Sequence, residues 1–134
     1  MIQETFVIIK PEGVKKGLIG EIISRFEKKD LKIKALSVKK ISRELAEVHY
    51  SHQSDKPYFQ GIIDAFTCSE VVLMILEGEE AIKTVRNLIG CTNPLEAAPG
   101  TIRGDFGTVL PFNVVHASDS EASVKAEIAR FFSC

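Results

Sequence analysis

The sequence lacks several features that would point to particular classes of protein. Its 134 residues carry a formal net charge of -1, so no overall positive field attracts nucleic acid or an anionic membrane surface. No apolar run approaches the roughly 20 residues that span a bilayer, and Met1–Glu4 shows no secretion signal. We therefore expect a cytoplasmic protein that binds neither nucleic acid nor membranes, with a small molecule as its partner.

Clustered metal ligands and disulfide patterns are also absent. The three cysteines, Cys68, Cys91 and Cys134, are an odd number at wide spacing, so we predict free thiols. His49 and His52 lie on a polar segment and are predicted to be surface residues. No Asp, Glu and His residues recur at ligand spacing, so we predict no direct protein ligand for a metal.

Phosphate-binding loops are missing as well. Gly13, Gly17 and Gly20 lie near Lys15 and Lys16, but they form neither G-x-x-x-x-G-K-[ST] nor G-x-G-x-x-G. Any anion site must therefore be built from a few converging cations.

What is present is ordinary for a globular protein, with 45% hydrophobic and 26% charged residues, and we expect a single domain over residues 1–134. Apolar patterning predicts strands at Thr5–Ile9, Lys32–Val38, Glu70–Leu76 and Phe112–Val115. It predicts helices at Leu18–Phe26, Ser42–Val48, Pro57–Phe66, Ala81–Ile89 and Ser120–Phe132. Ser42 and Ser120 are expected N-caps, Pro57 a first-turn residue, and Gly90 the C′ residue of its helix. Residues 91–110 show no clean period, and such a long loop is usually functional or mobile.

This order of elements predicts an α+β, ferredoxin-like sandwich, in which helices pack on a four-stranded antiparallel sheet. A doubly wound parallel sheet is the alternative. The antiparallel arrangement is favoured because there are only four strands, and because the second strand is rich in lysine and looks half-exposed.

The most informative segment is Asn113–Asp119, which sets His116 at the end of an apolar run where a strand gives way to a helix. Imidazole, with a reference pKa of roughly 6.5, presents an unprotonated nitrogen as a nucleophile near neutral pH. A buried or capping histidine is the alternative interpretation. Three cations, Lys10, Arg86 and Arg103, would supply the charge that a phosphate-transfer site needs.

The chain resembles the nucleoside diphosphate kinase family along nearly its whole length. The matching segments are Ile9–Val14 (IKPEGV), Thr92–Pro94 (TNP), Pro99–Phe106 (PGTIRGDF) and Asn113–Ser120 (NVVHASDS). Four concurrent matches in the right order are specific, although each alone is weak. The resemblance implies a ferredoxin-like fold, a magnesium-bound nucleotide, and transfer of a γ-phosphate from nucleoside triphosphates to diphosphates (ATP, GTP, ADP, GDP and others).

By position, His116 resembles the family's phosphorylated nucleophile, which implies ping-pong kinetics. The resemblance implies that Glu127 and Ser118 orient this histidine and that Tyr50 lies near it. It implies that the phosphates are bound by Lys10, Arg86, Thr92 and Arg103. It also implies that Asn113 and Lys10 contact the ribose and that Tyr58 and Leu110 lie against the base. Stacking reads no base edge, so low base specificity is expected. Mg²⁺ would be held through the nucleotide phosphates rather than by a protein cage. Asp119 is predicted to start a helix rather than bind the metal.

Two departures from the family pattern affect the sugar and base positions. Pro111-Phe112 stands where the family generally has Gly-Arg, and this change affects how Asn113 is aimed at the ribose. Tyr58 stands where phenylalanine is more common. Family members are tetramers or hexamers, so we expect a homo-oligomer.

Two other functions fit a ferredoxin-like domain. A nucleotide-binding regulator would keep the cations but would not require His116. An RNA-binding domain would need exposed aromatic pairs beside a basic stripe. That function fits poorly, because the phenylalanines Phe6, Phe26, Phe66, Phe131 and Phe132 sit at core-pattern positions.

Overall fold

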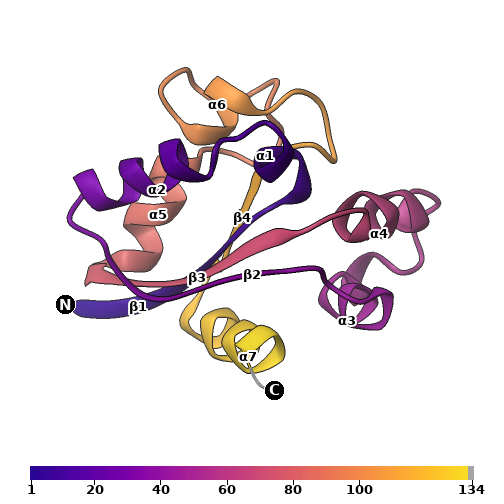
Figure 1. Ribbon diagram of the computed structural model, residues 1–134, viewed down its shortest axis with the longest axis horizontal. Helices are drawn as coiled ribbons and strands as arrows, with labels where there is room; N and C mark the ends of the chain where they lie inside the picture. Colours follow the sequence, from indigo (N-terminus) through magenta and orange to yellow (C-terminus); the bar gives the residue numbers. More distant parts are fainter. Residues whose placement is uncertain (133–134) are drawn as a thin grey trace.

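The computed structural model describes residues 1–132, which form one sheet and its surrounding helices (Figure 1). The elements are β1 (Ile2–Ile9), α1 (Pro11–Lys15), α2 (Ile19–Lys28), β2 (Lys32–Lys39), α3 (Arg43–His49), η1 (Ser51–Gln53), α4 (Phe59–Thr67), β3 (Val71–Glu79), α5 (Ala81–Ile89), α6 (Ile102–Phe106), β4 (Val115–Ala117) and α7 (Glu121–Phe132).

The four strands form an antiparallel sheet in the order β2-β3-β1-β4. The ferredoxin-like prediction is confirmed, and the doubly wound parallel alternative is wrong. The apolar strand β3 lies inside the sheet, as its sequence predicts, and β4 lies at an edge. An edge strand has one row of unpaired backbone groups, and this position of β4 decides how the site is built.

Helices cover both faces of the sheet. Alternating residues of β1 divide between two apolar clusters: Val7 and Ile9 pack with α2 and α5, and Phe6 and Ile8 pack with α3, α4 and α7. In Figure 1, α2 and α5 accordingly lie on one side of the strands and α7 on the other. Residues Phe6–Ile9 at the centre of β1 are therefore covered on both faces, and this part of the sheet offers no open surface for RNA.

Several predicted boundaries are corrected by the structure. The last strand is β4, three residues later than the predicted Phe112–Val115, because residues 110–114 form turns instead of pairing with β1. Pro57 lies before α4, whose N-cap is Tyr58, so it is not a first-turn residue. The aperiodic segment 91–110 contains the short helix α6, and α1 is a second helix that periodicity missed. Both are five residues long, which is too short to establish a helical period.

The predicted helix ends are supported by capping contacts. The Ser42 hydroxyl accepts a hydrogen bond from the Leu45 amide at 3.2 Å, and the Ser120 hydroxyl accepts one from the Ser123 amide at 3.1 Å. Gly90 is the C-cap of α5 instead of the predicted C′ residue, and its φ of 87° is a conformation that favours glycine. A Cβ at Gly90 would also lie 2.6 Å from the Thr101 hydroxyl, so the close approach of α6 requires glycine there.

No helix within residues 1–132 combines the length and apolarity needed to cross a membrane. Cys68 and Cys91 are free and exposed, which confirms the prediction for these two thiols. The third, Cys134, lies outside the described residues.

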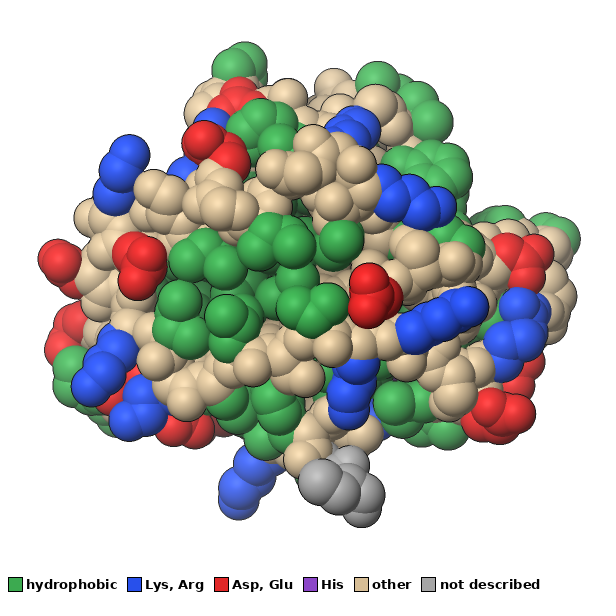
Figure 2. All heavy atoms as spheres, viewed as in Figure 1, with side chains coloured by type: hydrophobic (Ala, Val, Ile, Leu, Met, Phe, Trp, Pro, Cys, Tyr) green, Lys and Arg blue, Asp and Glu red, His purple; other side chains and the backbone are tan. Residues whose placement is uncertain are grey.

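One face of the molecule carries an apolar area. Figure 2 shows hydrophobic side chains gathered in the middle of the face on which β2 lies in Figure 1. Leu36 and Val38 of β2 are both about half-exposed. They pair with Met74 and Val72, whose side chains belong to the core cluster under α2 and α5. This part of β2 therefore presents apolar side chains that no helix covers among the described residues.

Candidate active site

A cavity of about 1090 Å³ opens beside β4 and α7. It is lined by nearly all of the predicted site residues, namely Lys10, Tyr50, Tyr58, Arg86, Thr92, Arg103, Leu110, Asn113, His116 and Glu127. Ser118 is the exception, since it is 1% exposed and lies behind Glu127. The fold therefore brings together residues that are more than a hundred positions apart in the sequence.

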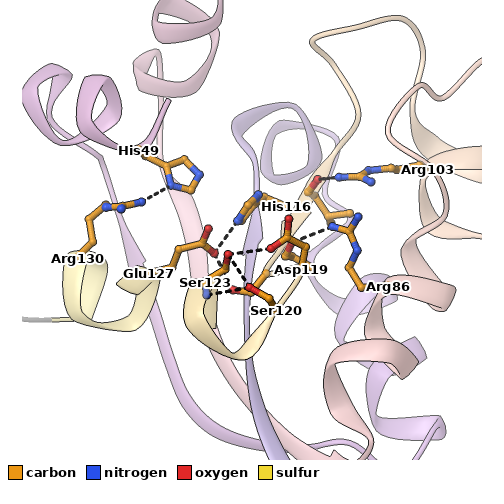
Figure 3. Close-up of polar contacts among 12 residues, drawn as sticks. His49, Arg86, Arg103, His116, Asp119, Ser120, Ser123, Glu127 and Arg130 are labelled. Atoms are coloured by element: carbon orange, nitrogen blue, oxygen red, sulfur yellow. Dashed lines mark hydrogen bonds and ion pairs between the residues drawn. The ribbon is translucent and has the colours of Figure 1, made fainter. Parts of the chain in front are cut away.

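His116 lies in the middle of β4, paired with Ile8 of β1, instead of after the end of a strand. Its Nε2 is 2.8 Å from Oε1 of Glu127, and the Ser118 hydroxyl donates to the same oxygen at 2.6 Å (Figure 3). A carboxylate only accepts hydrogen bonds, so the ring proton of a neutral His116 lies on Nε2. Nδ1 then carries the free lone pair, and no described residue forms a hydrogen bond with it. The group available for reaction is therefore Nδ1.

Glu127 stays ionised in this environment. Its partial burial works to raise the pKa of the carboxyl, but the hydrogen bonds and charge of His116 and the bond from Ser118 outweigh it, so the pKa is lowered. An ionised Glu127 stabilises positive charge on the imidazole and fixes which nitrogen carries the proton.

The free edge of β4 anchors two arginines on either side of His116. Arg103 donates to the Val115 carbonyl at 2.9 Å and to the Gly90 carbonyl at 3.0 Å, and Arg86 donates to the Ala117 carbonyl at 3.1 Å. The Val115 and Ala117 carbonyls are free because β4 is an edge strand, which pairs only with β1 among the described residues. The sheet order thus places two guanidinium groups next to the histidine.

Lys10, the residue that follows β1, is the third cation that lines the cavity. It is 7% exposed, and its ammonium donates to the Pro111 carbonyl at 2.6 Å and to Oδ1 of Asn113 at 2.8 Å. Burial lowers the pKa of Lys10, the Glu12 carboxylate 3.5 Å away opposes this, and the charge of Arg103 lowers it further. Burial and the charge of Arg86 likewise lower the pKa of Arg103 to about 10.

These cations destabilise one another, and a bound polyanion would relieve their repulsion. In addition, Nε of Arg103 is buried and has no hydrogen-bond partner among the described residues. A buried donor without a partner is uncommon in native proteins and is consistent with a ligand atom in this position.

The segment before His116 holds strained backbone. Val114 has φ of 73°, which is unfavourable for a β-branched residue. Its carbonyl accepts from the Lys10 amide at 2.8 Å, and its amide donates to the Glu12 carboxylate at 3.0 Å. A Cβ at Gly13 would lie 3.0 Å from Val114 and 2.9 Å from Ile9, so glycine permits α1 to pack here. The IKPEGV and NVVHASDS segments are therefore packed and hydrogen-bonded against each other next to His116.

The mouth of the cavity is apolar. Tyr58, just before α4, is 53% exposed, and Leu110 and Phe112, in the loop before β4, are about half-exposed; all three line the cavity. Asn113, beneath Phe112, donates to the Thr92 carbonyl at 2.9 Å, so the Pro111-Phe112 departure leaves the contacts of Asn113 with Lys10 and Thr92 in place.

The prediction for His49 is wrong, because this residue is 7% exposed and lines the cavity beside His116. Leu45 and Ala46, one turn earlier on α3, are apolar and pack into the core, and this spacing is the signal that could have identified His49 as inward-facing. His52, by contrast, is exposed as expected. Arg130 of α7 also lines the cavity, and no sequence pattern had singled it out.

The fold brings together a group of ligand atoms that the sequence spacing does not reveal. One ligand atom each of His49, His116 and Glu127 lie within 4.8 Å of one another. The residues are already engaged with one another and with Arg130, which contacts Nδ1 of His49 at 2.9 Å. The adjacent arginines would repel a cation, so we assign this group no metal.

The fold and the cavity together define a class of protein: an enzyme that transfers phosphoryl groups. One ring nitrogen of His116 is free, and three cations, Lys10, Arg86 and Arg103, line the same cavity. The apolar side chains of Tyr58, Leu110 and Phe112 also line this cavity, where they can hold a planar group. Phosphoryl transfer requires positioning and neutralisation of charge from the protein, which is what these residues provide.

Comparison with known proteins gives the particular family. The family model described as nucleoside diphosphate kinase matches residues 3–134. A nucleoside diphosphate kinase of Archaeoglobus fulgidus is 54% identical over 132 residues, which cover 98% of this chain and 87% of that protein. Nucleoside diphosphate kinase 1 of Saccharum officinarum is 51% identical, over 98% of this chain and 88% of that protein.

Solved structures agree. The nucleoside diphosphate kinase of Halobacterium salinarum, determined in complex with CDP, superposes with a TM-score of 0.96 at 44% identity, covering 100% of this chain and 90% of that one. The chain belongs to the nucleoside diphosphate kinase family, and its activity is the transfer of a phosphoryl group between nucleoside tri- and diphosphates.

Proposed function

We propose that the enzyme works through a phosphohistidine on Nδ1 of His116. The lone pair of Nδ1 attacks the γ-phosphorus of a nucleoside triphosphate such as ATP. The N–P bond forms as the bond to the β,γ-bridging oxygen breaks, and the nucleoside diphosphate leaves with those electrons. A second diphosphate then attacks the phosphohistidine through its terminal oxygen, and the histidine is regenerated. The observation that supports this most directly is the free Nδ1 of a ring whose Nε2 is held by Glu127.

The cations would hold the transferred group. Arg86 and Arg103 are bonded to the residues on either side of His116, and Lys10 lines the same cavity. Each of the three would neutralise charge that develops on the phosphate oxygens. Thr92 lines the same cavity and would hold the phosphate chain, and Tyr50 would pack near the reacting histidine. Asn113 and Lys10 would contact the ribose at the point where they already contact each other.

Glu127 and Ser118 would orient the nucleophile without touching the substrate. Ser118 is buried and donates to the carboxylate, and the carboxylate holds Nε2. This chain of two hydrogen bonds would keep Nδ1 turned toward the cations throughout the reaction.

The base would lie between Tyr58 and Leu110 at the mouth of the cavity. These side chains offer an aromatic face and an apolar surface, which contact every base alike and read no edge. The relative from Halobacterium salinarum was solved with a pyrimidine diphosphate. We therefore propose low discrimination among bases for this chain.

We propose Mg²⁺ as the cation that accompanies the substrate. Among residues 1–132, the carboxylates that line the cavity are Asp119 and Glu127, and Glu127 is engaged with His116. Asp119 accepts a hydrogen bond from the Ser123 hydroxyl at 2.8 Å near the start of α7, in keeping with a helix-start role. A site so poor in carboxylates fits an ion held mainly by phosphate oxygens and water. When bound, Mg²⁺ would neutralise charge on the β- and γ-phosphates.

We further propose that the chain is a single cytoplasmic domain and forms a homo-oligomer. The unpaired edge of β2 and its exposed Leu36 and Val38 support self-association, since such surfaces tend to be buried against a partner. Sedimentation velocity would distinguish a tetramer or hexamer from a monomer.

Labelling with γ-³²P-ATP tests the proposed chemistry. The enzyme is expected to acquire acid-labile, base-stable label on His116 and to surrender it to GDP. The variant His116→Ala is expected to bind nucleotide without labelling, and His52→Ala, at an exposed histidine, serves as the matched control. Absence of label on the parent protein, or exchange near the parent rate in His116→Ala, would exclude the phosphohistidine. If the protein were a nucleotide-binding regulator without catalysis, the parent protein would bind nucleotide but acquire no label.

A further inference from the structure

We propose that His49 is a positioning residue for His116, and that Arg130 keeps it in this role by fixing its tautomer and its neutral form. The inference rests on the proposed phosphohistidine, because it concerns how the ring that carries the phosphoryl group is held.

The surroundings of His49 form an aromatic enclosure. Its ring is 5.1 Å from Phe131 and 6.0 Å from Phe66, and Tyr50 stands nearly perpendicular to it at 4.7 Å, all measured between centroids. The remaining contact is with His116, at 4.7 Å and an interplanar angle of 87°. Phe6 contacts the His116 ring at 6.5 Å as well. His49 is therefore part of the packing that restricts rotation of the His116 ring.

Arg130 determines which nitrogen of His49 carries the proton. Its Nη1 is 2.9 Å from Nδ1 of His49 (Figure 3). Guanidinium has donors and no acceptor, and it stays protonated in proteins, so Nδ1 must be the acceptor. The proton of the neutral ring then lies on Nε2. A protonated His49 has two N–H donors and would lose this hydrogen bond while facing a like charge.

A positively charged His49 would disturb the hydrogen bond between His116 and Glu127. Ligand atoms of His49, His116 and Glu127 lie within 4.8 Å of one another, so a cationic His49 would compete with His116 for the Glu127 carboxylate. Loss of that carboxylate would release Nε2 and allow Nδ1 to turn away from the arginines. Holding His49 neutral keeps Glu127 committed to His116.

The groups that face His49 have opposing effects on its protonation. Burial, together with the charges of His116, Arg130 and His52, lowers the pKa of His49 to about 3, and Glu127 opposes them. Removing the charge of Arg130 therefore raises the pKa of His49.

The test compares three α7 variants of the full chain. Arg130→Met removes the charge and the donor but keeps an apolar stem, and Arg130→Lys keeps a charge and an N–H donor. Lys125→Met removes a positive charge from an exposed position of the same helix. The rate of His116 labelling by γ-³²P-ATP is measured in a single turnover from pH 4.5 to 8.5. The chain has three histidines, so ¹⁵N NMR spectra of the imidazoles can be assigned with single substitutions.

In the parent enzyme, we expect His49 to carry its proton on Nε2 and not to titrate between pH 5 and 8. In Arg130→Met, the His49 signals should show a mixture of the two tautomers and a titration moved to higher pH, and His116 should be labelled more slowly than in the parent enzyme. Arg130→Lys should restore the parent profile, and Lys125→Met should leave it unchanged.

Two results would overturn the inference: a proton on Nδ1 of His49 in the parent enzyme, or His49 signals that are the same in Arg130→Met and the parent. A purely structural role for Arg130 would lower the rate and leave the tautomer of His49 unchanged. Failure of the proposed function is distinguishable, because the parent enzyme itself would then remain unlabelled.

Discussion

Replacing Glu127 by glutamine tests how much of the reactivity of His116 depends on the carboxylate behind it. The change keeps the shape of the side chain but removes its charge, and its amide group can donate to Nε2. That donation would favour the tautomer with the proton on Nδ1, and the lone pair needed for attack would be lost. The folded protein should otherwise be preserved, because the second N–H of the amide can donate to the Ser118 hydroxyl, which contacts the same oxygen of Glu127 in the parent.

The size of the effect follows from the geometry. Removing the buried carboxylate that orients a catalytic histidine costs about 10⁴ in rate in the Ser-His-Asp enzymes. Glu127 is 12% exposed, and water can partly replace it, so we expect a smaller loss of roughly 10²- to 10³-fold, or about 3 to 4 kcal/mol in the barrier.

The measurement is single-turnover formation of acid-labile phosphohistidine from γ-³²P-ATP, followed by rapid quench at pH 7.5. Glu121→Gln makes the same chemical change at an exposed position of the same helix and should label at the parent rate. Nucleotide affinity should change little, since Glu127 holds the histidine instead of the substrate. Labelling of Glu127→Gln within threefold of the parent would refute the orienting role.

Three further predictions concern the base site, the core and acid stability. Tyr58→Ala should weaken ATP and GTP binding by about the same amount, about 1 to 3 kcal/mol, whereas Tyr58→Phe should not; a base-dependent loss in calorimetric titrations would contradict non-selective stacking. Phe66→Ala empties a fully buried position in the cluster under α4 and α7 and should lower the free energy of unfolding by about 3 to 5 kcal/mol in urea titrations, against less than about 0.5 for the exposed Lys28→Ala. Because the folded-state pKa of Glu127 is depressed, its contribution to stability is present above the unfolded pKa and is lost as pH falls through the folded value. The urea midpoints of the parent and Glu127→Gln should therefore differ at pH 7 and converge as the pH falls below about 4.

Much of the fold could be predicted because it follows from local patterns. The alternation of Phe6, Val7, Ile8 and Ile9 shows a strand whose two faces are both apolar, and the structure divides these residues between two clusters. The position of β4 could not be predicted, because Phe112 to Val115 has the apolar pattern of a strand, whereas the structure has turns there and a positive φ at Val114.

The site residues were identified through a resemblance of motifs, and the sequence could not show how they are held. His49 illustrates the difference. The polar segment around it predicts a surface position, yet α3 places the His49 ring against Phe66 and Phe131 of other helices. Its contact with Arg130 joins residues 81 positions apart, and no pattern in either segment of the sequence indicates it.

The sequence by itself determined the strand and helix content, the two-faced core and the set of reactive side chains, because these depend on residue type and short-range spacing. Only the tertiary structure decided that β4 lies at the sheet edge, where the carbonyls of Val115 and Ala117 are free to hold Arg103 and Arg86 beside His116. It also decided that Nε2 of His116 faces Glu127 and that Nδ1 is left free. The reason is that strand order and ring orientation depend on contacts between segments that are distant along the chain.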